Sequence, residues 1–285
     1  MDKTIRLVDE KKSIYQITVT NERFYALPDT DKTTGLPTFV FLPSATWIAG
    51  CWPKGIAFYK WLSEKGWDEA EAIKSAAGDK GSLVHQACED IEKGVEIALN
   101  KQYAGPSGET RDLAPEEIEC LASFIRWLDK EKPQCLLSEM TVVGDGYAGT
   151  IDRIYRIAGQ IWIVDLKTSK SIWREHKLQV AAYSHANIDY LKLGITEAEW
   201  ANRKLALLQV GYKMNKDGFK FTEVEDKYET FLIAKKIWQE ENPEWKPRQI
   251  EYPLILKSQW VAAQAQGKLS QATEAKPNAT PRPKK

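Results

Sequence analysis

The sequence predicts a mixed α/β (α+β) fold in which one central mixed sheet is flanked by helices. Helical periodicity dominates the first half, three strand-like runs follow closely, and a helix, a strand hairpin and a last helix come after them. The 285 residues are 43% hydrophobic and 28% charged, which is enough to bury a sizeable core. We expect one domain over residues 1–265, with a helical arm at about 44–131, a core at about 135–242, and a disordered tail at 266–285.

The first expected elements are a strand, a strand–helix unit and a short helix. Residues 13–20 alternate between apolar and polar side chains, as a half-buried strand does. Residues 38–52 indicate a strand followed by a helix, with Ser44 as its N-cap. Residues 54–66 form an amphipathic pattern that Gly66 ends.

Two longer helices complete the predicted arm. Residues 68–99 have a helical pattern, and the glycines of Gly78–Gly81 predict a break within it. Residues 114–131 carry Pro115 in the first turn, where proline is tolerated. The apolar stripe of this helix is expected to consist of Ile118, Leu121, Ile125 and Leu128.

The second half begins with three closely spaced strands. They are expected at 135–143, 147–157 and 161–167. Because the links between them are short, the strands should form antiparallel hairpins. A helix closed by Gly194, a second hairpin and a last helix should follow, at 174–194, 204–214 with 218–225, and 227–242.

The overall charge excludes a global electrostatic field for polyanions. The chain holds 40 basic and 40 acidic residues, so any nucleic-acid site must be a local patch. The N-terminus is too polar for a signal peptide, and no apolar run approaches the ~20 residues that span a bilayer. We therefore expect a soluble, cytoplasmic protein with no membrane partner.

The cysteines do not have the spacing of a metal-binding motif. No two form a CxxC pair, and two lie inside apolar helical patterns. We expect buried free thiols in a reducing compartment and no structural zinc. The four cysteines are Cys51, Cys88, Cys120 and Cys135.

An acid and a base stand two residues apart in the apolar run IWIVDLK. Asp165 and Lys167 project to the same face of this strand, and burying both charges is costly unless they are paired or bound. The pair is either a structural ion pair at a strand end or part of a metal-and-lysine catalytic edge. A second acid, Asp152 in GTID, should lie near the same end of the sheet if the two strands form a hairpin.

Two carboxylates that converge repel each other unless a cation lies between them. Oxygen ligands of this kind suit Mg²⁺ or Mn²⁺. The alternative is that Asp152 and Asp165 only cap turns. Two pairs of polar residues in the predicted helices also favour the metal site. His85 and Glu89 are i, i+4 neighbours on one helix, and Gln179 and Tyr183 are i, i+4 neighbours on another. Taken alone, a helical histidine is more often a surface or core-edge residue than a ligand, and a Gln–Tyr pair is ordinary helix surface.

The ordered set GSLVH, GTID, DLK and QVAAY resembles the RecB-like branch of the PD-(D/E)XK nuclease superfamily. The upstream LPSATWIAG and WLSEKG are similar to the N-terminal arm of phage and mitochondrial genome-maintenance exonucleases of that branch. The resemblance covers roughly residues 40–212. It implies a restriction-endonuclease-like core with an N-terminal helical arm. It also implies a metal-dependent DNA nuclease, expected to be an exonuclease in replication, recombination or repair.

The resemblance also implies roles for single residues. Mg²⁺ or Mn²⁺ would be held by Asp152 and Asp165, helped by His85 and the main-chain carbonyl of Leu166. Lys167 would position or deprotonate the attacking water. The helical pair Gln179 and Tyr183 would orient Lys167 and the scissile phosphate. Glu89 is a candidate for a second site, and Glu139 in the preceding strand is a weaker candidate.

A local basic cluster is the candidate DNA surface. It consists of Lys167, Lys170, Arg174 and Lys177, interleaved with Trp173. Such a patch would bind phosphates without sequence preference, and Trp173 could stack on an unpaired base. The alternative is a solvated helix start with Trp173 in the core. The expected partners are linear single- or double-stranded DNA and recombination or replication proteins, and the compact build favours a phage origin.

The chain departs from its relatives at three points. Asp165 stands where glutamate is common, although the family pattern also accepts aspartate. No cysteine follows Cys135, so the iron–sulfur cluster of some relatives is not expected, and no helicase domain accompanies the nuclease. The rival hypotheses are a non-catalytic nucleic-acid-binding or assembly module, a structural protein and an endonuclease. Polarity and strand preference are left open.

Overall fold

The computed structural model describes residues 3–19, 22–33, 35–98, 100–105 and 109–247. The chain divides into two compact units, Met1–Pro243 and Glu244–Lys285, and every described helix and strand lies in the first. The tail expected at 266–285 lies outside the described residues. No helix in the described ranges is long and apolar enough to cross a membrane.

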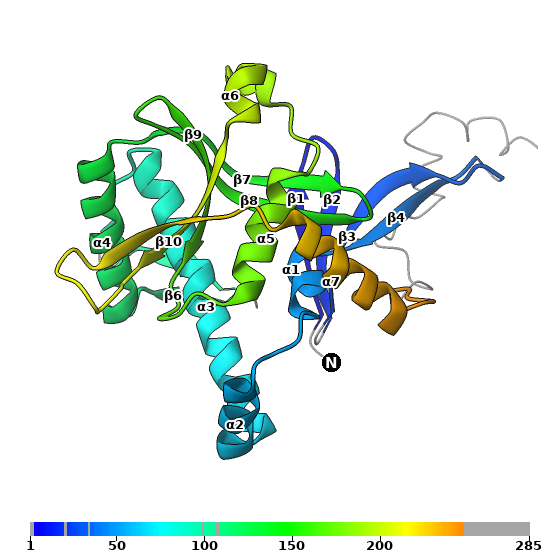
Figure 1. Cartoon of the computed structure of the whole chain (residues 1–285), viewed down its shortest axis with the longest axis horizontal. Coiled ribbons are helices and arrows are strands. Elements are labelled where there is room, and N and C mark those ends of the chain that lie inside the picture. Colours follow the sequence, from blue (N-terminus) through cyan, green and yellow to red (C-terminus); the bar gives the residue numbers. More distant parts are fainter. Residues whose placement is uncertain (1–2, 20–21, 34, 99, 106–108, 248–285) are drawn as a thin grey trace, which may run out of the picture. The chain divides into compact units, whose positions relative to one another are not determined.

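A five-stranded mixed sheet forms the centre of the first unit (Figure 1). Its order is β11-β10-β9-β8-β7, and only the β9–β10 pair is parallel. The predicted hairpins and the mixed sheet are confirmed. The strands are β7 Gln134–Gly144, β8 Tyr147–Ile157, β9 Gln160–Lys167, β10 Lys204–Val210 and β11 Phe219–Val224.

Helices cover both faces of this sheet (Figure 1). One face packs on α3 (Trp67–Glu92) and α4 (Pro115–Glu131), with Val164 and Leu166 of β9 in that core. The other face packs on α5 (Arg174–Ser184). Since side chains alternate along a strand, Asp165 and Lys167 face α5.

Two further helices pack against α5. They are α1 (Ala45–Gly50) and α7 (Tyr228–Glu241). The predicted cap of α1 is confirmed, because the Ser44 hydroxyl accepts a hydrogen bond from Trp47 N at 3.0 Å. The predicted end of α2 (Ile56–Lys65) is also confirmed, since Gly66 adopts the positive φ of 74° that glycine tolerates.

A second, four-stranded antiparallel sheet lies against the β7–β8 hairpin. Its strands run in sequence order, and Tyr25 OH lies 3.2 Å from Thr150 Oγ1. The strands predicted at 13–20 and 38–43 are confirmed as β2 and β4, whereas β1 and β3 escaped the sequence analysis. The bounds are β1 Lys3–Asp9, β2 Ile14–Val19, β3 Glu22–Thr30 and β4 Pro37–Pro43.

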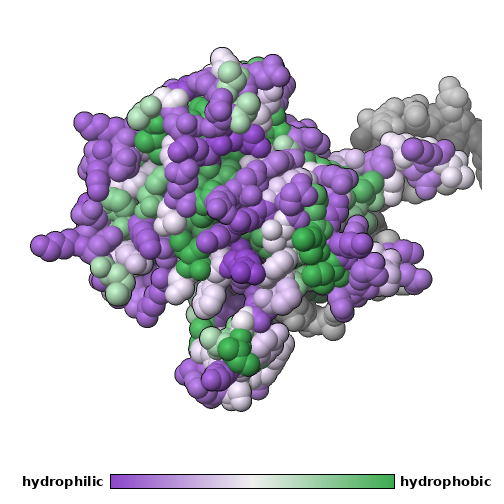
Figure 2. Space-filling view, in the orientation of Figure 1, coloured by the Kyte–Doolittle hydropathy of each residue, from purple (hydrophilic) through white to green (hydrophobic). Residues whose placement is uncertain are grey.

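Small elements complete the unit. They are the strand pair β5 Gln102–Ala104 and β6 Thr110–Asp112, the 3₁₀ helix η1 Tyr190–Leu193, and α6 Glu197–Ala201. The face in Figure 2 is mostly hydrophilic, with smaller hydrophobic patches between the polar side chains.

Two helix predictions were wrong in extent. The break at Gly78–Gly81 is absent, because α3 is continuous over 26 residues and ends at Glu92 rather than at 99. Packing of α3 against its neighbours outweighs the low helix propensity of glycine. The helix expected at 174–194 ends at Ser184, and Gly194 instead closes the 3₁₀ helix η1 with a φ of 69°.

The buried face of α4 also differs from the predicted stripe. Leu121 is buried as predicted, and Ile118 and Leu128 are partly buried, but Ile125 is 43% exposed. The helix also buries Cys120, Phe124 and Trp127, which the stripe did not include. The two aromatic rings stack on each other and remove more apolar area from water than the branched aliphatic residues would. All four cysteines are free, but Cys51 is only half-buried and Cys135 is exposed, so the expectation of buried thiols was wrong for Cys135.

Candidate active site between the central sheet and two helices

The site begins where the β8–β9 ladder ends. Arg153 pairs with Val164 in the ladder, so the next positions are Asp152 and Asp165. Beyond this pair, Leu166 N donates its hydrogen bond to the side chain of Asp152 rather than to a backbone oxygen of β8. The distance from Leu166 N to Asp152 Oδ2 is 2.7 Å. Two buried carboxylates, 7% and 1% exposed, thus come to the same end of the hairpin.

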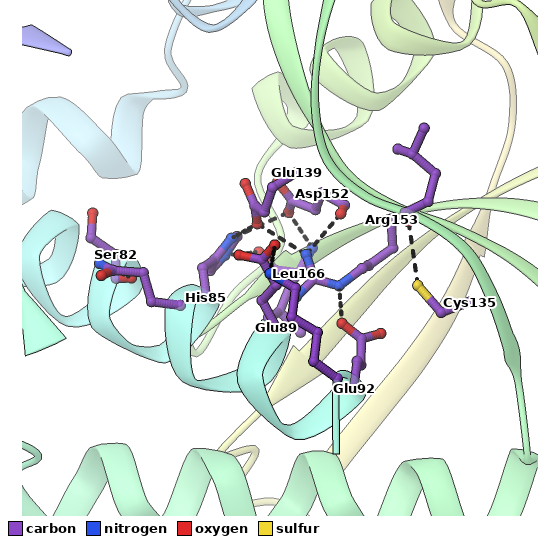
Figure 3. A network of polar contacts seen from close by, with 12 residues as sticks. Ser82, His85, Glu89, Glu92, Cys135, Glu139, Asp152, Arg153 and Leu166 are labelled. Carbon is purple, nitrogen blue, oxygen red and sulfur yellow. Dashed lines mark hydrogen bonds and ion pairs between the residues drawn. The ribbon is translucent and has the colours of Figure 1, made fainter. Parts of the chain in front are cut away.

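A histidine from α3 faces this end of the sheet (Figure 3). His85 Nδ1 lies 3.4 Å from Glu139 Oε1 and 3.7 Å from Asp152 Oδ2, and Nε2 lies 3.1 Å from the carbonyl oxygen of Leu166. Donor atoms of His85, Glu139 and Asp152 lie within 4.8 Å of one another. One nitrogen and several oxygens in this space match the donors that Mg²⁺ or Mn²⁺ accepts.

Asp165 has the features of a residue placed for a cation. Lys167 Nζ lies 2.7 Å from Asp165 Oδ2 and forms an ion pair with it. Neither carboxylate oxygen of Asp165 has a hydrogen-bond partner among the described residues. A buried carboxylate is costly unless its oxygens are bound, so the residues present fit a divalent cation.

The pKa shifts reflect the crowding of acids. Although burial opposes its charge, the carboxylates of Asp152 and Glu139 raise the pKa of His85 to about 9. Burial raises the pKa of Asp152 to about 7, His85 opposes this shift, and Asp165 adds to it. Burial also acts to raise the pKa of Glu139, but His85 and Arg153 hold it below its usual range. Asp152 is therefore partly protonated at neutral pH, whereas Glu139 stays ionised beside His85 and Arg153. Acids crowded together in this way favour a bound cation.

Lys167 contacts Gln179 of α5, which in turn binds Tyr183 of the same helix. Lys167 Nζ lies 3.4 Å from Gln179 Oε1, and Gln179 Nε2 donates to Tyr183 OH at 2.8 Å. Burial opposes the ammonium charge, but Asp165 and then Asp152 raise the pKa of Lys167. Lys167 is therefore a cation at neutral pH. The structure brings together all five residues that the sequence singled out as catalytic.

Glu139 is more closely involved than the sequence indicated. It lies in the middle of β7 with a φ of 49°, a left-handed conformation that costs a non-glycine residue about 1–3 kcal/mol. Its Oε1 accepts from Arg153 Nη1 at 2.9 Å as well as facing His85. Strain of this size persists where surrounding contacts hold it, and it is typical of functional positions.

Glu89, the candidate for a second site, lies next to this cluster in Figure 3. Its carboxylate pairs with Lys93 at 2.7 Å, one turn further along α3. Lys93 is exposed, so the pair is a surface contact of small energetic weight.

The predicted DNA patch lies around the start of α5. Trp173 is 52% exposed, so the alternative of a core tryptophan was wrong. Lys170 is exposed in the preceding loop, and the guanidinium of Arg174 lies 5.4 Å above the ring of Trp52. Lys177 is half-buried.

Sequence reasoning missed three charged residues around the site. Arg153 and Glu92 form a buried ion pair beside the cluster, and Arg23 of β3 opposes the upward shift of the Lys167 pKa. A signal for Arg153 was available, because a charged residue inside the apolar run IDRIY must find a partner. Glu92 stands seven residues after His85 and therefore on the same helix face.

Comparison with known families gives one result. A sequence model described as the PD-(D/E)XK nuclease superfamily matches residues 58–239. The matched segment contains every residue of the cluster, from His85 to Tyr183. Comparison with curated proteins finds no match.

Proposed function

Because this chain belongs to the PD-(D/E)XK nuclease superfamily, we propose that it is a divalent-metal-dependent deoxyribonuclease. We further propose that it acts as an exonuclease on linear DNA in replication, recombination or repair. The observation that carries the proposal is the meeting of a metal-donor cluster with a charged lysine. Lys167 contacts Asp165 on one side and Gln179 on the other.

The residues divide into two groups by what they would do. His85 and Asp152, whose donor atoms lie together with those of Glu139, would hold Mg²⁺ or Mn²⁺ with the help of Asp165 and the carbonyl oxygen of Leu166. When bound, such an ion lowers the pKa of water and neutralises charge on a phosphate. His85 must be neutral to donate to the ion, so binding would displace the proton that its raised pKa retains.

Lys167 would act as a positioned cation. Its raised pKa keeps it protonated, so it donates hydrogen bonds to a phosphate oxygen or a water rather than accepting a proton. Gln179 and Tyr183 would hold its direction, because their side chains bond to each other and Tyr183 is only 3% exposed. A fixed donor costs little reorganisation as negative charge develops.

The exonuclease and DNA-processing roles rest on the resemblance of residues 40–212 to phage and mitochondrial exonucleases. The exposed Lys170 and Trp173 support contact with DNA, since the first can bind phosphate and the second can stack on a base. Recombination or replication proteins are the proposed partners, and a cytoplasmic setting, including that of a phage-infected bacterium, fits this role.

A degradation assay tests the proposal. End-labelled linear single- and double-stranded DNA and a closed circle are incubated with Mg²⁺, Mn²⁺ or EDTA. Lys167→Ala is the inactive variant, and Lys93→Ala is the matched control because it removes an exposed lysine paired outside the cluster. Metal-dependent loss of linear DNA that only Lys167→Ala abolishes supports the nuclease.

The circle separates the two modes of cleavage. An intact circle beside degraded linear DNA supports an exonuclease, whereas a nicked or linearised circle shows an endonuclease. Retained DNA binding with no cleavage of any substrate by folded protein overturns the proposal in favour of a binding module. Circular dichroism of each variant excludes unfolding as the cause of lost activity.

A further inference from the structure

A buried arginine lies directly beside the metal-donor cluster (Figure 3). Arg153 follows Asp152 in β8 and is 1% exposed. Its Nη1 donates to Glu139 Oε1 at 2.9 Å and to the main-chain oxygen of Asp152 at 2.7 Å, while its Nε donates to Glu92 Oε2 at 2.5 Å. One cation thus links β7, β8 and α3 at the point where the cluster forms.

Glu92 holds this arginine in a single orientation. Its Oε2 is bound by Arg153, and its Oε1 accepts the hydroxyl of Tyr155. Glu92 has a side-chain exposure of 6%, and Tyr155 is fully buried. Both oxygens of Glu92 are therefore occupied inside the core, and the guanidinium is bound by Glu92 through Nε and by Glu139 through Nη1.

One carboxylate oxygen of Glu139 binds Arg153, and the other can bind an ion. Arg153 Nη1 and His85 Nδ1 both face Oε1, whereas no hydrogen bond or ion pair in the described part of the chain engages Oε2. The left-handed backbone of Glu139 would relax in an ordinary strand, so contacts to its side chain must hold it. Arg153 is the buried donor that does so.

The charges also favour a cation at this point. Glu92 and Glu139 contact the fixed cation Arg153, Asp165 contacts the fixed cation Lys167, and the fourth acid, Asp152, faces His85. With His85 neutral, as a ligand must be, the cluster carries an excess of negative charge. A divalent ion compensates for this excess.

We propose that Glu139 is a further side-chain ligand of the divalent ion, and that Arg153 is the positioning residue that holds Glu139 for this role. Glu92 and Tyr155 in turn hold Arg153. The inference rests on the proposed function in so far as the ion is the cofactor of the nuclease. It goes further by assigning the metal affinity to a buried ion-pair network rather than to the four donors alone.

The test is direct Mn²⁺ binding, measured by calorimetry and by the Mn²⁺ magnetic-resonance signal, with no DNA present. The variants are Glu139→Gln, Arg153→Lys and the double variant. Arg153→Lys keeps the charge but loses the planar fork that contacts both glutamates. Each single change should weaken Mn²⁺ binding about tenfold or more, the usual effect of losing a residue that orients a ligand.

The double variant decides whether Arg153 acts through Glu139. If it does, Arg153→Lys should change the affinity of the Glu139→Gln protein by no more than about twofold. Effects that add, or an unchanged affinity in a folded Arg153→Lys protein, would overturn the inference. Absence of Mn²⁺ binding by the native protein would overturn it as well.

Two further variants control for unfolding and for effects that any buried arginine–glutamate pair would have. Glu92→Gln keeps the shape of the network and should also weaken Mn²⁺ binding in a folded protein. Arg111→Lys is the matched control, since Arg111 forks onto buried Glu117 at 2.6 and 2.8 Å without contacting the cluster. It should leave the affinity unchanged. The outcome does not depend on cleavage, so a protein that binds Mn²⁺ through Glu139 but cuts no DNA refutes only the proposed function.

Discussion

Replacing Gly149 by alanine perturbs the candidate site through a single methyl group. Gly149 opens the GTID segment in β8, and the ring of Tyr183 lies directly over it. A Cβ at this position would stand 2.3 Å from Tyr183 Cε1 and 3.1 and 3.2 Å from two neighbouring ring carbons. Real Cβ atoms essentially never come closer than 3.0 Å, so the ring or the strand must move.

The size of the effect follows from these contacts. Ordinary contact begins at 3.4 Å, so the ring has to shift by roughly 1 Å. Overpacking of this kind costs about 1–3 kcal/mol, more than the ~0.4–1 kcal/mol that alanine contributes by restricting the unfolded chain. Since Tyr183 binds Gln179 and Gln179 faces Lys167, a 1 Å displacement should lower the cleavage rate by about 100-fold.

Urea unfolding and single-turnover cleavage measure the two effects separately. Mn²⁺ affinity should change much less than the cleavage rate, because no hydrogen bond or ion pair among the described residues joins Tyr183 to His85, Glu139 or Asp152. The loss of stability should shrink in a Tyr183→Ala background, where the clash is absent. Gly78→Ala is the control: this helical glycine has nothing within 4 Å of its Cβ, and alanine there should stabilise the fold by about 1 kcal/mol. A Gly149→Ala protein as stable and as active as the native one refutes the reasoning.

Three further predictions concern DNA, metal and pH. Lys170→Ala and Arg174→Ala should each reduce the slope of log K against log salt for DNA binding by about 1, and Trp173→Ala should weaken single-strand binding by about 1–3 kcal/mol, as measured by fluorescence anisotropy. Mn²⁺ at a hundredfold excess over its Kd should raise the unfolding free energy by about 2.7 kcal/mol, and EDTA should remove the gain in a thermal melt. Burial, with Lys167 and Lys54 adding to it, lowers the pKa of His176 from 6.5 to about 3, and its Nδ1 accepts from Trp173 N at 3.3 Å. Between these two pH values the unfolded chain is protonated at His176 and the folded chain is not, so the contribution of His176 to stability should be lost as pH falls from about 6.5 towards 3. The variant His176→Gln should flatten that part of a pH–stability curve.

Most of the central sheet could be predicted because its signals are local. The strands β7, β8 and β9 are apolar runs joined by short glycine-containing links, which favour hairpins wherever the rest of the chain lies. The ends of the long helices were less predictable. Gly78 sits inside α3 because contacts with α4 and the sheet hold that helix, and no local signal reports such contacts.

The candidate site was predictable to the extent that its residues break a local pattern. Asp165 is an acid in an apolar strand, and Asp152 is another, so each had to be paired or bound. Glu139 and Glu89 looked alike in this respect, because both are acids in amphipathic segments. The sheet register sets Glu139 opposite Asp152, whereas the turn of α3 points Glu89 to Lys93.

By itself the sequence determined the order of the elements, the alternation that places Asp165 and Lys167 on one face, and the presence of acids that could not remain unpaired. These properties depend on neighbours along the chain, and the backbone geometry of strands and helices enforces them. The tertiary structure alone decided which partners meet. Arg153 reaches Glu92 across 61 residues, and His85 reaches Leu166 across 81. Contacts of that length exist only after the β8–β9 hairpin has set its register and α3 has packed across it.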